Sequence, residues 1–119
     1  MRNPYKLRLT ETAFGIAELT YRATADFPSD ERFGLVSQMR RASVSIGSNI
    51  AEGCGRNSDR QLVNFLQYSS GSASELDFQA RLAARLKMGR PEPLFELCEM
   101  VELERKMLAR YARHLAAEK

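Results

Sequence analysis

The stretch MRRASVSIGSNIAEGCGRNS, residues 39–58, contains a helical repeat of apolar residues and the signals that end it. Met39, Ala42 and Ile46 recur at spacings of three and four residues, which places them on one face of a helix. Glycines follow this repeat, and Ser58 begins a capping box that is typical of a helix start. The stretch therefore predicts two helices joined by a short turn, and such helices pack as antiparallel neighbours.

Two further breaks divide the rest of the chain. Pro28 with Ser29 is expected to separate a first helix from a second, and Ser29 to cap the second. Gly89, followed by prolines, is expected to cap the end of a third helix before a fourth begins. The predicted helices cover about residues 5–25, 30–53, 59–88 and 92–117. The predicted fold class is all-α, an antiparallel up-down-up-down four-helix bundle in one domain spanning residues 1–119.

The core is predicted from the residues that face the bundle axis in each helix. They are Leu9, Ala13, Ile16 and Ala23, then Leu35, Met39, Ala42 and Ile46, then Leu62, Leu66, Ser69, Ala73, Leu76, Ala80 and Ala83, then Leu94, Leu97, Val101, Leu108 and Leu115. The first and fourth helices each carry a second apolar stripe, formed by Phe14, Ala17 and Tyr21 and by Met100, Leu103 and Met107. Each second stripe either widens the core or forms a subunit interface.

Polar and small residues interrupt the core pattern of the second and third helices. Asn49 falls on the core stripe, where a buried amide needs hydrogen-bonding partners. Gly71 would destabilise a helix interior unless close packing offsets its cost. Folding the two helices together brings Arg41 near Glu75, so we expect an ion pair between them. The predicted structural motif comprises Arg41, Asn49, Glu52, Gly53, Gly71 and Glu75, for which ligand binding is the alternative role.

Composition and motifs argue against several functional classes. The 119 residues are 44% hydrophobic and 28% charged, which is typical of a globular protein. No apolar run approaches the roughly 18 residues that span a bilayer, and the N-terminus lacks an apolar signal core. We therefore expect a cytoplasmic protein without membrane association, in which Cys54 and Cys98 are free thiols. Since His114 is the only histidine and no phosphate-binding loop occurs, we expect no enzymatic activity, no cofactor and no metal site.

Basic residues gather at one end of the predicted rod, although the net charge is only +3. This end, formed by residues 1–12, 42–73 and 105–119, holds ten basic and four acidic residues, and the remainder holds eight and eleven. Such an end would attract phosphate backbones without sequence preference, whereas cations near helix ends can also be merely solvated. The candidate nucleic-acid contacts are Arg56, Arg60, Arg105, Lys106, Arg110 and Arg113, with Arg40 and Arg41 added if the second helix lines a ring of subunits.

Several short motifs occur in an order that resembles one bacterial family. They are Phe27-Pro28 with Glu31, Gly34-Leu35, Gln38 to Ala42, Ser45-Ile46, Asn49 to Gly53, Phe65-Leu66, Gly71-Ser72 and Glu75-Leu76. Over nearly the whole chain they resemble the four-helix bundle proteins encoded in intervening sequences of 23S ribosomal RNA. The run from Gln38 to Gly53 is the most specific part. Ala73-Ser74 departs from the pattern, because an aliphatic residue often stands there.

The resemblance implies a homo-oligomeric ring, typically a pentamer. Relatives include the accessory variability protein of diversity-generating retroelements, which forms a basic barrel that binds nucleic acid and a reverse transcriptase. The family name describes a genomic location, so it does not imply ribosomal RNA as the ligand. Two hypotheses follow from the residues and the resemblance together. The protein either binds RNA or DNA nonspecifically through a basic rim, or acts as a scaffold for a protein partner without binding nucleic acid.

Overall fold

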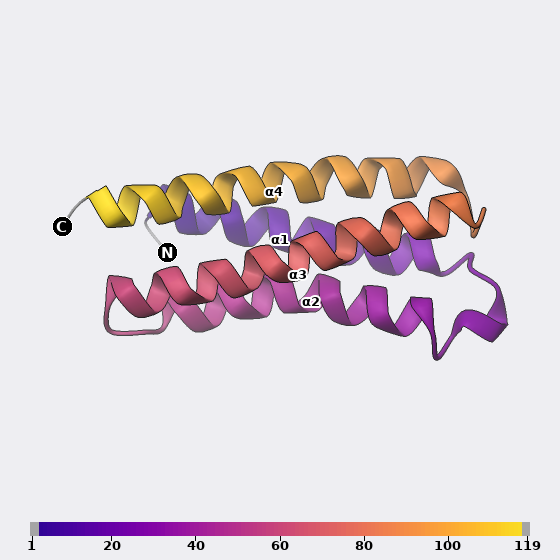
Figure 1. Ribbon diagram of the computed structural model, residues 1–119, viewed down its shortest axis with the longest axis horizontal. Coiled ribbons are helices and arrows are strands. Elements are labelled where there is room, and N and C mark those ends of the chain that lie inside the picture. Colours follow the sequence, from indigo (N-terminus) through magenta and orange to yellow (C-terminus); the bar gives the residue numbers. More distant parts are fainter. Residues whose placement is uncertain (1–2, 118–119) are drawn as a thin grey trace.

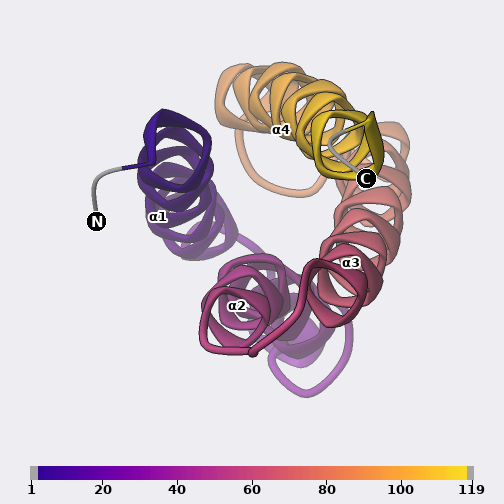
Figure 2. The same ribbon diagram turned by 90° about the vertical axis from the view of Figure 1, so that its left-hand side faces the viewer.

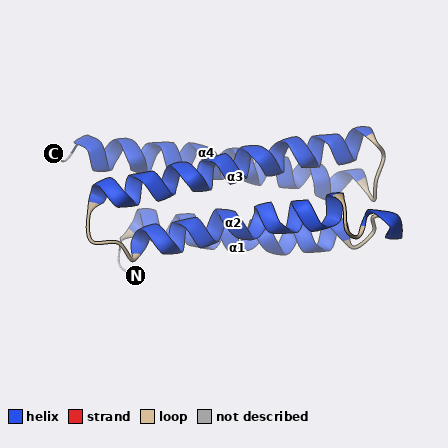
Figure 3. Cartoon of the chain, turned by 60° about the horizontal axis from the view of Figure 1, so that its bottom comes forward, coloured by secondary structure: helices blue, strands red, loops and turns tan. Residues whose placement is uncertain are grey.

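The computed structural model describes residues 3–117, which form four long α-helices and one short 3₁₀ helix (Figure 1). In chain order these are α1 (Pro4–Thr24), η1 (Ser29–Glu31), α2 (Leu35–Cys54), α3 (Asp59–Arg85) and α4 (Pro91–Ala117). Consecutive long helices run antiparallel, and the described residues contain no strand (Figure 3). The predicted all-α, up-down-up-down four-helix bundle is therefore confirmed.

The bundle is a rod that measures 49 × 22 × 21 Å. Viewed along its length, the helices follow one another around a common axis, so that α1 packs against α2 and α4, and α3 packs against the same two helices (Figure 2). The start of α1, the α2–α3 turn and the end of α4 share one end of the rod (Figure 1). The α1–α2 connection and the α3–α4 turn share the other end.

The core follows the predicted stripes closely. All the predicted core positions are buried except Leu35 and Asn49, which are half buried. Of the second stripes, Phe14 and Leu103 are exposed, whereas Met100 and Met107 pack partly against the core. The flexible methionines therefore widen the core, which is one of the two roles predicted for the second stripes. Phe14 and Leu103 remain available on the surface for a subunit interface.

Buried and half-buried hydroxyl groups join α2 to α3. Ser69 Oγ donates a hydrogen bond to the Ile46 carbonyl oxygen at 2.8 Å, and the hydroxyl oxygens of Ser45 and Ser72 lie 2.8 Å apart. The Asn49 side-chain amide donates to the carbonyl oxygen and to the hydroxyl of Ser45 on its own helix. Asn49 therefore reaches the neighbouring helix only through Ser45, and its amide is satisfied without full burial.

The start of α2 differs from the prediction. The helix begins at Leu35, about one turn later than expected, because Ser29 belongs to the separate 3₁₀ helix η1. Glu31 takes over the expected capping role of Ser29, since its Oε1 accepts a hydrogen bond from the Leu35 backbone N–H at 3.1 Å. Ser58 does cap α3 as predicted, because its Oγ accepts from the Gln61 backbone N–H at 3.2 Å.

The end of α3 also differs from the prediction. The helix ends at Arg85, and the backbone N–H groups of Lys87 and Met88 donate to carbonyl oxygens of its last turn, as in a Schellman motif. Lys87, not glycine, adopts the left-handed conformation of this motif, with φ 58°. Gly89 was the predicted cap, but it lies beyond the helix with φ 66°, where a Cβ would come within 3.0 Å of the Phe27 ring.

Close approach of α2 and α3 occurs at Gly53 and not at Gly71. A Cβ on Gly53 would lie 2.8 Å from Phe65 Cβ, so only glycine allows this packing. A Cβ on Gly71 would meet no atom within 4 Å, because the residue is exposed on the outside of α3. The expectation that close packing offsets the cost of Gly71 is therefore wrong for the single chain.

The expected ion pair between Arg41 and Glu75 is also absent from the described structure. The two residues border the same hollow between α2 and α3, but no ion pair joins them within 4 Å. Both residues are exposed, and Glu75 Oε2 instead accepts a hydrogen bond from Gln79 Nε2 at 3.4 Å. Exposed ion pairs gain little free energy over separate solvation, which accounts for this outcome.

Candidate nucleic-acid interface

The end of the rod that carries the start of α1 and the end of α4 is positively charged. Its described residues include eight basic and three acidic side chains. The basic residues are Lys6, Arg8, Arg56, Arg60, Arg105, Lys106, Arg110 and Arg113, and the acidic ones are Glu11, Glu52 and Asp59. Arg2, Glu118 and Lys119, which the sequence also assigns to this end, lie outside the described residues. We call this region the basic end.

Three of the candidate cations are engaged in ion pairs with carboxylates that lie three or four residues earlier in the chain. The Arg56 guanidinium lies 2.6 Å from a carboxylate oxygen of Glu52, one turn earlier in α2. Arg105 and Lys106 share Glu102, at 3.9 Å and 3.8 Å. All these side chains are exposed. Such pairs contribute only about 0.3–0.5 kcal/mol, so a phosphate group could displace the carboxylate.

The other candidate cations of the basic end are unpaired. Arg60, Arg110 and Arg113 form no ion pair within 4 Å with any described residue, and neither does Arg8. All four are exposed. Their guanidinium groups are therefore available to an anionic ligand, and Arg8 joins the candidates that the sequence had suggested.

Arg40 and Arg41 lie outside the basic end, near the start of α2 in the other half of the rod. Arg40 Nε donates to Thr24 Oγ1 at 2.9 Å, and an Nη group donates to the Tyr21 carbonyl oxygen at 3.3 Å. The guanidinium also lies over the Tyr21 ring, 4.5 Å from its centroid. Arg40 thus links α2 to the end of α1. The structure places Arg40 and Arg41 apart from the other candidate nucleic-acid contacts, which lie at the basic end.

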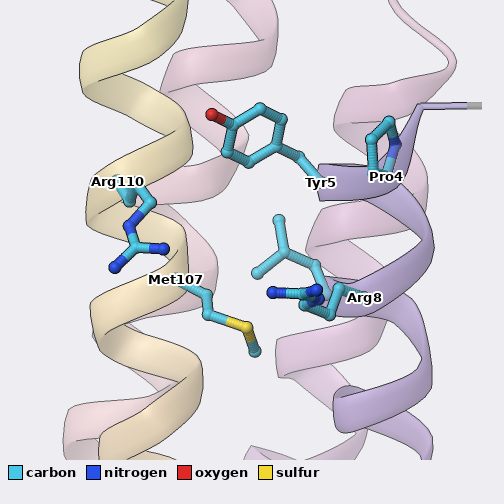
Figure 4. Close-up of a pocket in the computed structure, with 6 residues that line it drawn as sticks. Pro4, Tyr5, Arg8, Met107 and Arg110 are labelled. Atoms are coloured by element: carbon cyan, nitrogen blue, oxygen red, sulfur yellow. The ribbon is translucent and has the colours of Figure 1, made fainter.

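A groove between α1 and α4 hollows the basic end (Figure 4). Its volume is about 270 Å³, and it is lined by Pro4, Tyr5, Arg8, Leu9, Met107 and Arg110. Arg8 from α1 and Met107 from α4 extend toward the space between the helices, and Arg110 lies along α4 beside it (Figure 4). The lining contains no carboxylate. We call this feature the α1–α4 groove.

Aromatic stacking fixes one end of this groove. The Tyr5 ring stacks on Tyr111, with centroids 4.8 Å apart, and on His114, with centroids 4.9 Å apart. Asn3 caps α1 beside this stack, because its Oδ1 accepts hydrogen bonds from the backbone N–H groups of Tyr5 and Lys6. The start of α1 is therefore held against the end of α4, and the single histidine takes part in packing.

One carboxyl group, on α4, is buried in the core of the bundle. Glu104 has no exposed surface, and neither of its side-chain oxygens has a hydrogen-bond partner among the described residues. Burial raises the pKa of Glu104 to about 8. The group is therefore mostly protonated at neutral pH and adds little charge near the basic end.

The two cysteines of the described chain lie on different helices, α2 and α4. Cys54 and Cys98 are half-buried free thiols, as predicted, and burial raises the pKa of both. Residues 3–117 hold no group of histidine, cysteine, aspartate and glutamate side chains that could bind a metal ion. None of the described helices has an apolar stretch long enough to span a membrane.

The helix pairs α1–α2 and α3–α4 lie on opposite sides of the rod (Figure 2), and each carries exposed apolar side chains. The α1–α2 face presents Phe14, Tyr21 and Val44, and the α3–α4 face presents Phe78, Phe95 and Leu103. The α1–α2 face is hollowed by a groove of about 340 Å³ that is bordered by Phe14 and Val44. Exposed apolar surface of this kind is typical of protein–protein contacts.

Comparison with known proteins agrees with the architecture. The family described as 23S rRNA-intervening sequence protein matches residues 5–110. A crystal structure of a protein of unknown function from the S23 ribosomal protein family of Bacteroides thetaiotaomicron has a TM-score of 0.83 and 18% sequence identity. That similarity covers 92% of this chain and 98% of the other, and at this identity it shows the fold alone. Among curated proteins, none matches the chain significantly.

Proposed function

The chain belongs to the 23S rRNA-intervening sequence protein family, and from this we propose that it is a non-enzymatic, homo-oligomeric bundle that binds nucleic acid without sequence preference. One observation carries the proposal, the gathering of unpaired arginines at the basic end. Arg60, Arg110 and Arg113 offer exposed guanidinium groups that suit phosphate oxygens. Binding of this kind releases counterions, so its affinity falls steeply as salt rises.

The proposed assembly is a ring of parallel subunits, with five copies as the resemblance implies. Its support is the pair of apolar faces, because two different faces on opposite sides of one chain suit head-to-tail contacts that close into a ring. The charges beside the two faces differ. Arg40 and Arg41 border the hollow beside Tyr21 and Val44 without a carboxylate, whereas the hollow beside Phe95 and Leu103 is bordered by both acidic and basic side chains, namely Glu99, Glu102, Arg81 and Lys106. In such a ring all the basic ends would point the same way and form one basic rim.

Replacing Arg110 and Arg113 by glutamate tests the basic end. We expect the double variant to bind labelled RNA and DNA more weakly at every salt concentration, because two unpaired phosphate contacts are lost and repulsion is added. Fluorescence anisotropy measures the binding, and light scattering should show an unchanged oligomer. The double variant Arg22→Glu with Arg85→Glu carries the same charge change on exposed residues at the other end of the rod and serves as the control. Unchanged binding by the Arg110 and Arg113 variant would refute the assignment.

A protein-interaction scaffold is the second candidate. The two apolar faces favour it, because exposed apolar surface on the sides of the rod is typical of protein–protein contacts. Under this alternative, the protein would bind no RNA or DNA at about 50 mM salt, a concentration at which phosphate contacts are strong. A pull-down after nuclease treatment would then recover a specific protein partner.

A further inference from the structure

We propose that the α1–α4 groove binds one nucleotide of a single-stranded nucleic acid. Its phosphate would lie between Arg8 and Arg110, and its base against the apolar floor of the groove. This inference rests on the proposed nucleic-acid function, and it adds the position of one binding site and the form of the ligand.

The first argument is the paired placement of two unpaired cations. Arg8 and Arg110 come from different helices and line the same groove, and Figure 4 shows Arg8 extending toward its centre and Arg110 lying along its α4 side. Neither forms an ion pair with a described residue, and no carboxylate lines the groove to compete with a ligand. Guanidinium groups donate two parallel hydrogen bonds to phosphate oxygens, so two long, flexible arginine side chains on the walls of one groove suit binding of one phosphodiester group.

The second argument is the apolar floor of this groove. Leu9 and Met107 line the same groove as the two arginines, and so does Tyr5. An inorganic anion would use the guanidinium groups but leave this floor in water. A nucleotide satisfies both parts of the groove, because its phosphate is anionic and the face of its base is apolar. The thioether of Met107 is polarizable and suits contact with a planar aromatic ring.

The size of the groove favours a single strand over a duplex. Its volume of about 270 Å³ lies near the small end of ligand pockets and suits one nucleotide. In a duplex the bases are stacked and paired, so that their faces cannot reach an apolar floor. A single strand presents those faces, and stacking or packing against them stabilises binding without sequence preference.

The groove is held in shape before any ligand arrives. Stacking of Tyr5 on Tyr111 and His114 fixes the distance between the start of α1 and the end of α4. The Asn3 cap fixes the first turn of α1. A preformed site loses less conformational entropy on binding, so a small groove can contribute usefully to affinity.

The test measures anisotropy of a labelled RNA of about eight nucleotides, within the range that single-strand sites cover. We expect Arg8→Glu and Arg110→Glu each to weaken binding about tenfold, because each removes one of the two guanidinium groups of the groove. Arg22→Glu is the matched control, since Arg22 is an exposed arginine on α1 at the opposite end of the rod. It should change the affinity less than about twofold, because it touches neither the groove nor the basic end. Arg8→Lys should retain part of the binding, and circular dichroism should show that all variants are folded.

A second probe separates the base from the phosphate. An abasic strand of the same length and charge should bind the wild-type protein more weakly than the RNA with bases, as should a duplex of that length. Equal binding of the abasic strand would overturn the proposed base contact. Binding to anionic phosphatidylserine vesicles that is lost in Arg8→Glu, while RNA binding is unchanged, would assign the groove to a membrane surface and overturn the proposal.

Failure of the inference and failure of the proposed function give different results. If the wild-type protein binds no nucleic acid at about 50 mM salt, both are wrong. If the wild-type protein binds RNA and Arg110→Glu with Arg113→Glu weakens it, while Arg8→Glu behaves like Arg22→Glu, the basic end stands and the α1–α4 groove is not the site.

Discussion

Glu104 occupies a position in α4 that the helical repeat reserves for an apolar residue. It lies between Val101 and Leu108 on the stripe that faces the core, fully buried and without a hydrogen-bond partner in the described structure. An ionised carboxylate without a partner is unfavourable in such a place, so the proton is retained well above the ordinary pKa of the group. This single side chain should therefore make the stability of the bundle depend on pH.

We predict that Glu104 lowers the free energy of unfolding as pH rises from about 4.5 to about 8. In this window the folded protein holds a proton that the unfolded chain has released, so stability is fully present below pH 4.5 and is lost as pH rises through the folded pKa. Each unit of pKa difference corresponds to about 1.4 kcal/mol, so the loss amounts to a few kcal/mol. Urea denaturation across this pH range measures it.

Glu104→Gln should remove this part of the pH dependence, because the amide does not titrate. Glu96→Gln, an exposed glutamate on the same helix, should leave it in place. Identical pH profiles for the wild-type protein and Glu104→Gln would show that the group does not titrate in the core as described.

The core residues of α4 show which buried positions the helical repeat predicts and which it does not. The spacing of Leu94, Leu97 and Val101 predicts the core face of α4, and strict continuation of that spacing also reaches Glu104 and Tyr111. Both were missed, because a glutamate is almost never fully buried without a partner and a tyrosine is only intermediate in its tendency to be buried. Composition favours the surface for such residues, and only the three-dimensional packing overrides it.

At the scale of the helices, the contact between α2 and α3 depends on small residues at defined places. Ser69 and Ser45 bring hydroxyl groups into the interface, and Gly53 lets the helices meet where any side chain would collide with Phe65. Gly71 looks similar in the sequence but has open space beside it. The two glycines therefore make opposite contributions to stability.

We predict that Gly53→Ala destabilises the protein and that Gly71→Ala stabilises it. The first inserts a methyl group 2.8 Å from Phe65 Cβ, and overpacking of this kind costs typically about 1–3 kcal/mol. The second gains about 1 kcal/mol, because alanine favours the helix more than glycine and meets no obstacle. Thermal or urea unfolding measures both at low protein concentration. Destabilisation by Gly71→Ala would contradict the open environment of this residue and indicate that another chain packs there.

Helix positions could be predicted from the sequence better than helix ends. Periodicity located all four long helices, because burial of one face is repeated over several turns. The starts and ends depend on single contacts that periodicity does not contain. Glu31 caps α2 from a separate 3₁₀ helix, and Lys87 ends α3 in a conformation that glycine usually adopts.

At the scale of the whole molecule, the two apolar faces lie on the sides of the rod and the basic end lies at one of its ends, with Lys106 where it adjoins the α3–α4 face. This separation would allow subunits to join through their sides while the basic end stays free. The charge asymmetry could be counted from the sequence, because the antiparallel layout assigns each segment to an end. The α1–α4 groove could not, since it depends on the register of Arg8 against Arg110 across two helices that are far apart in the chain.

We predict that Phe14→Lys and Phe95→Lys each reduce the oligomer to smaller species. The two side chains are 62% and 70% exposed on opposite faces, so a charge on either would oppose the proposed head-to-tail contact without disturbing the core. Analytical ultracentrifugation measures the mass of each species. Phe33→Lys is the control, because Phe33 is 90% exposed on the α1–α2 connection, outside both faces. A monomeric wild-type protein, or variants with wild-type mass, would contradict the assembly.

The start of α1 and the end of α4 meet at one end of the rod, where the Asn3 side-chain amide donates to the Tyr111 hydroxyl at 3.4 Å (Figure 1). A short peptide could join these two points, and the chain could be reopened at the α3–α4 turn without loss of any helix contact. In such a circular permutant, purification tags and fluorophores would project from the far end of the rod. The arginines of the basic end would then be free of the steric hindrance that a tag attached near either native terminus would impose.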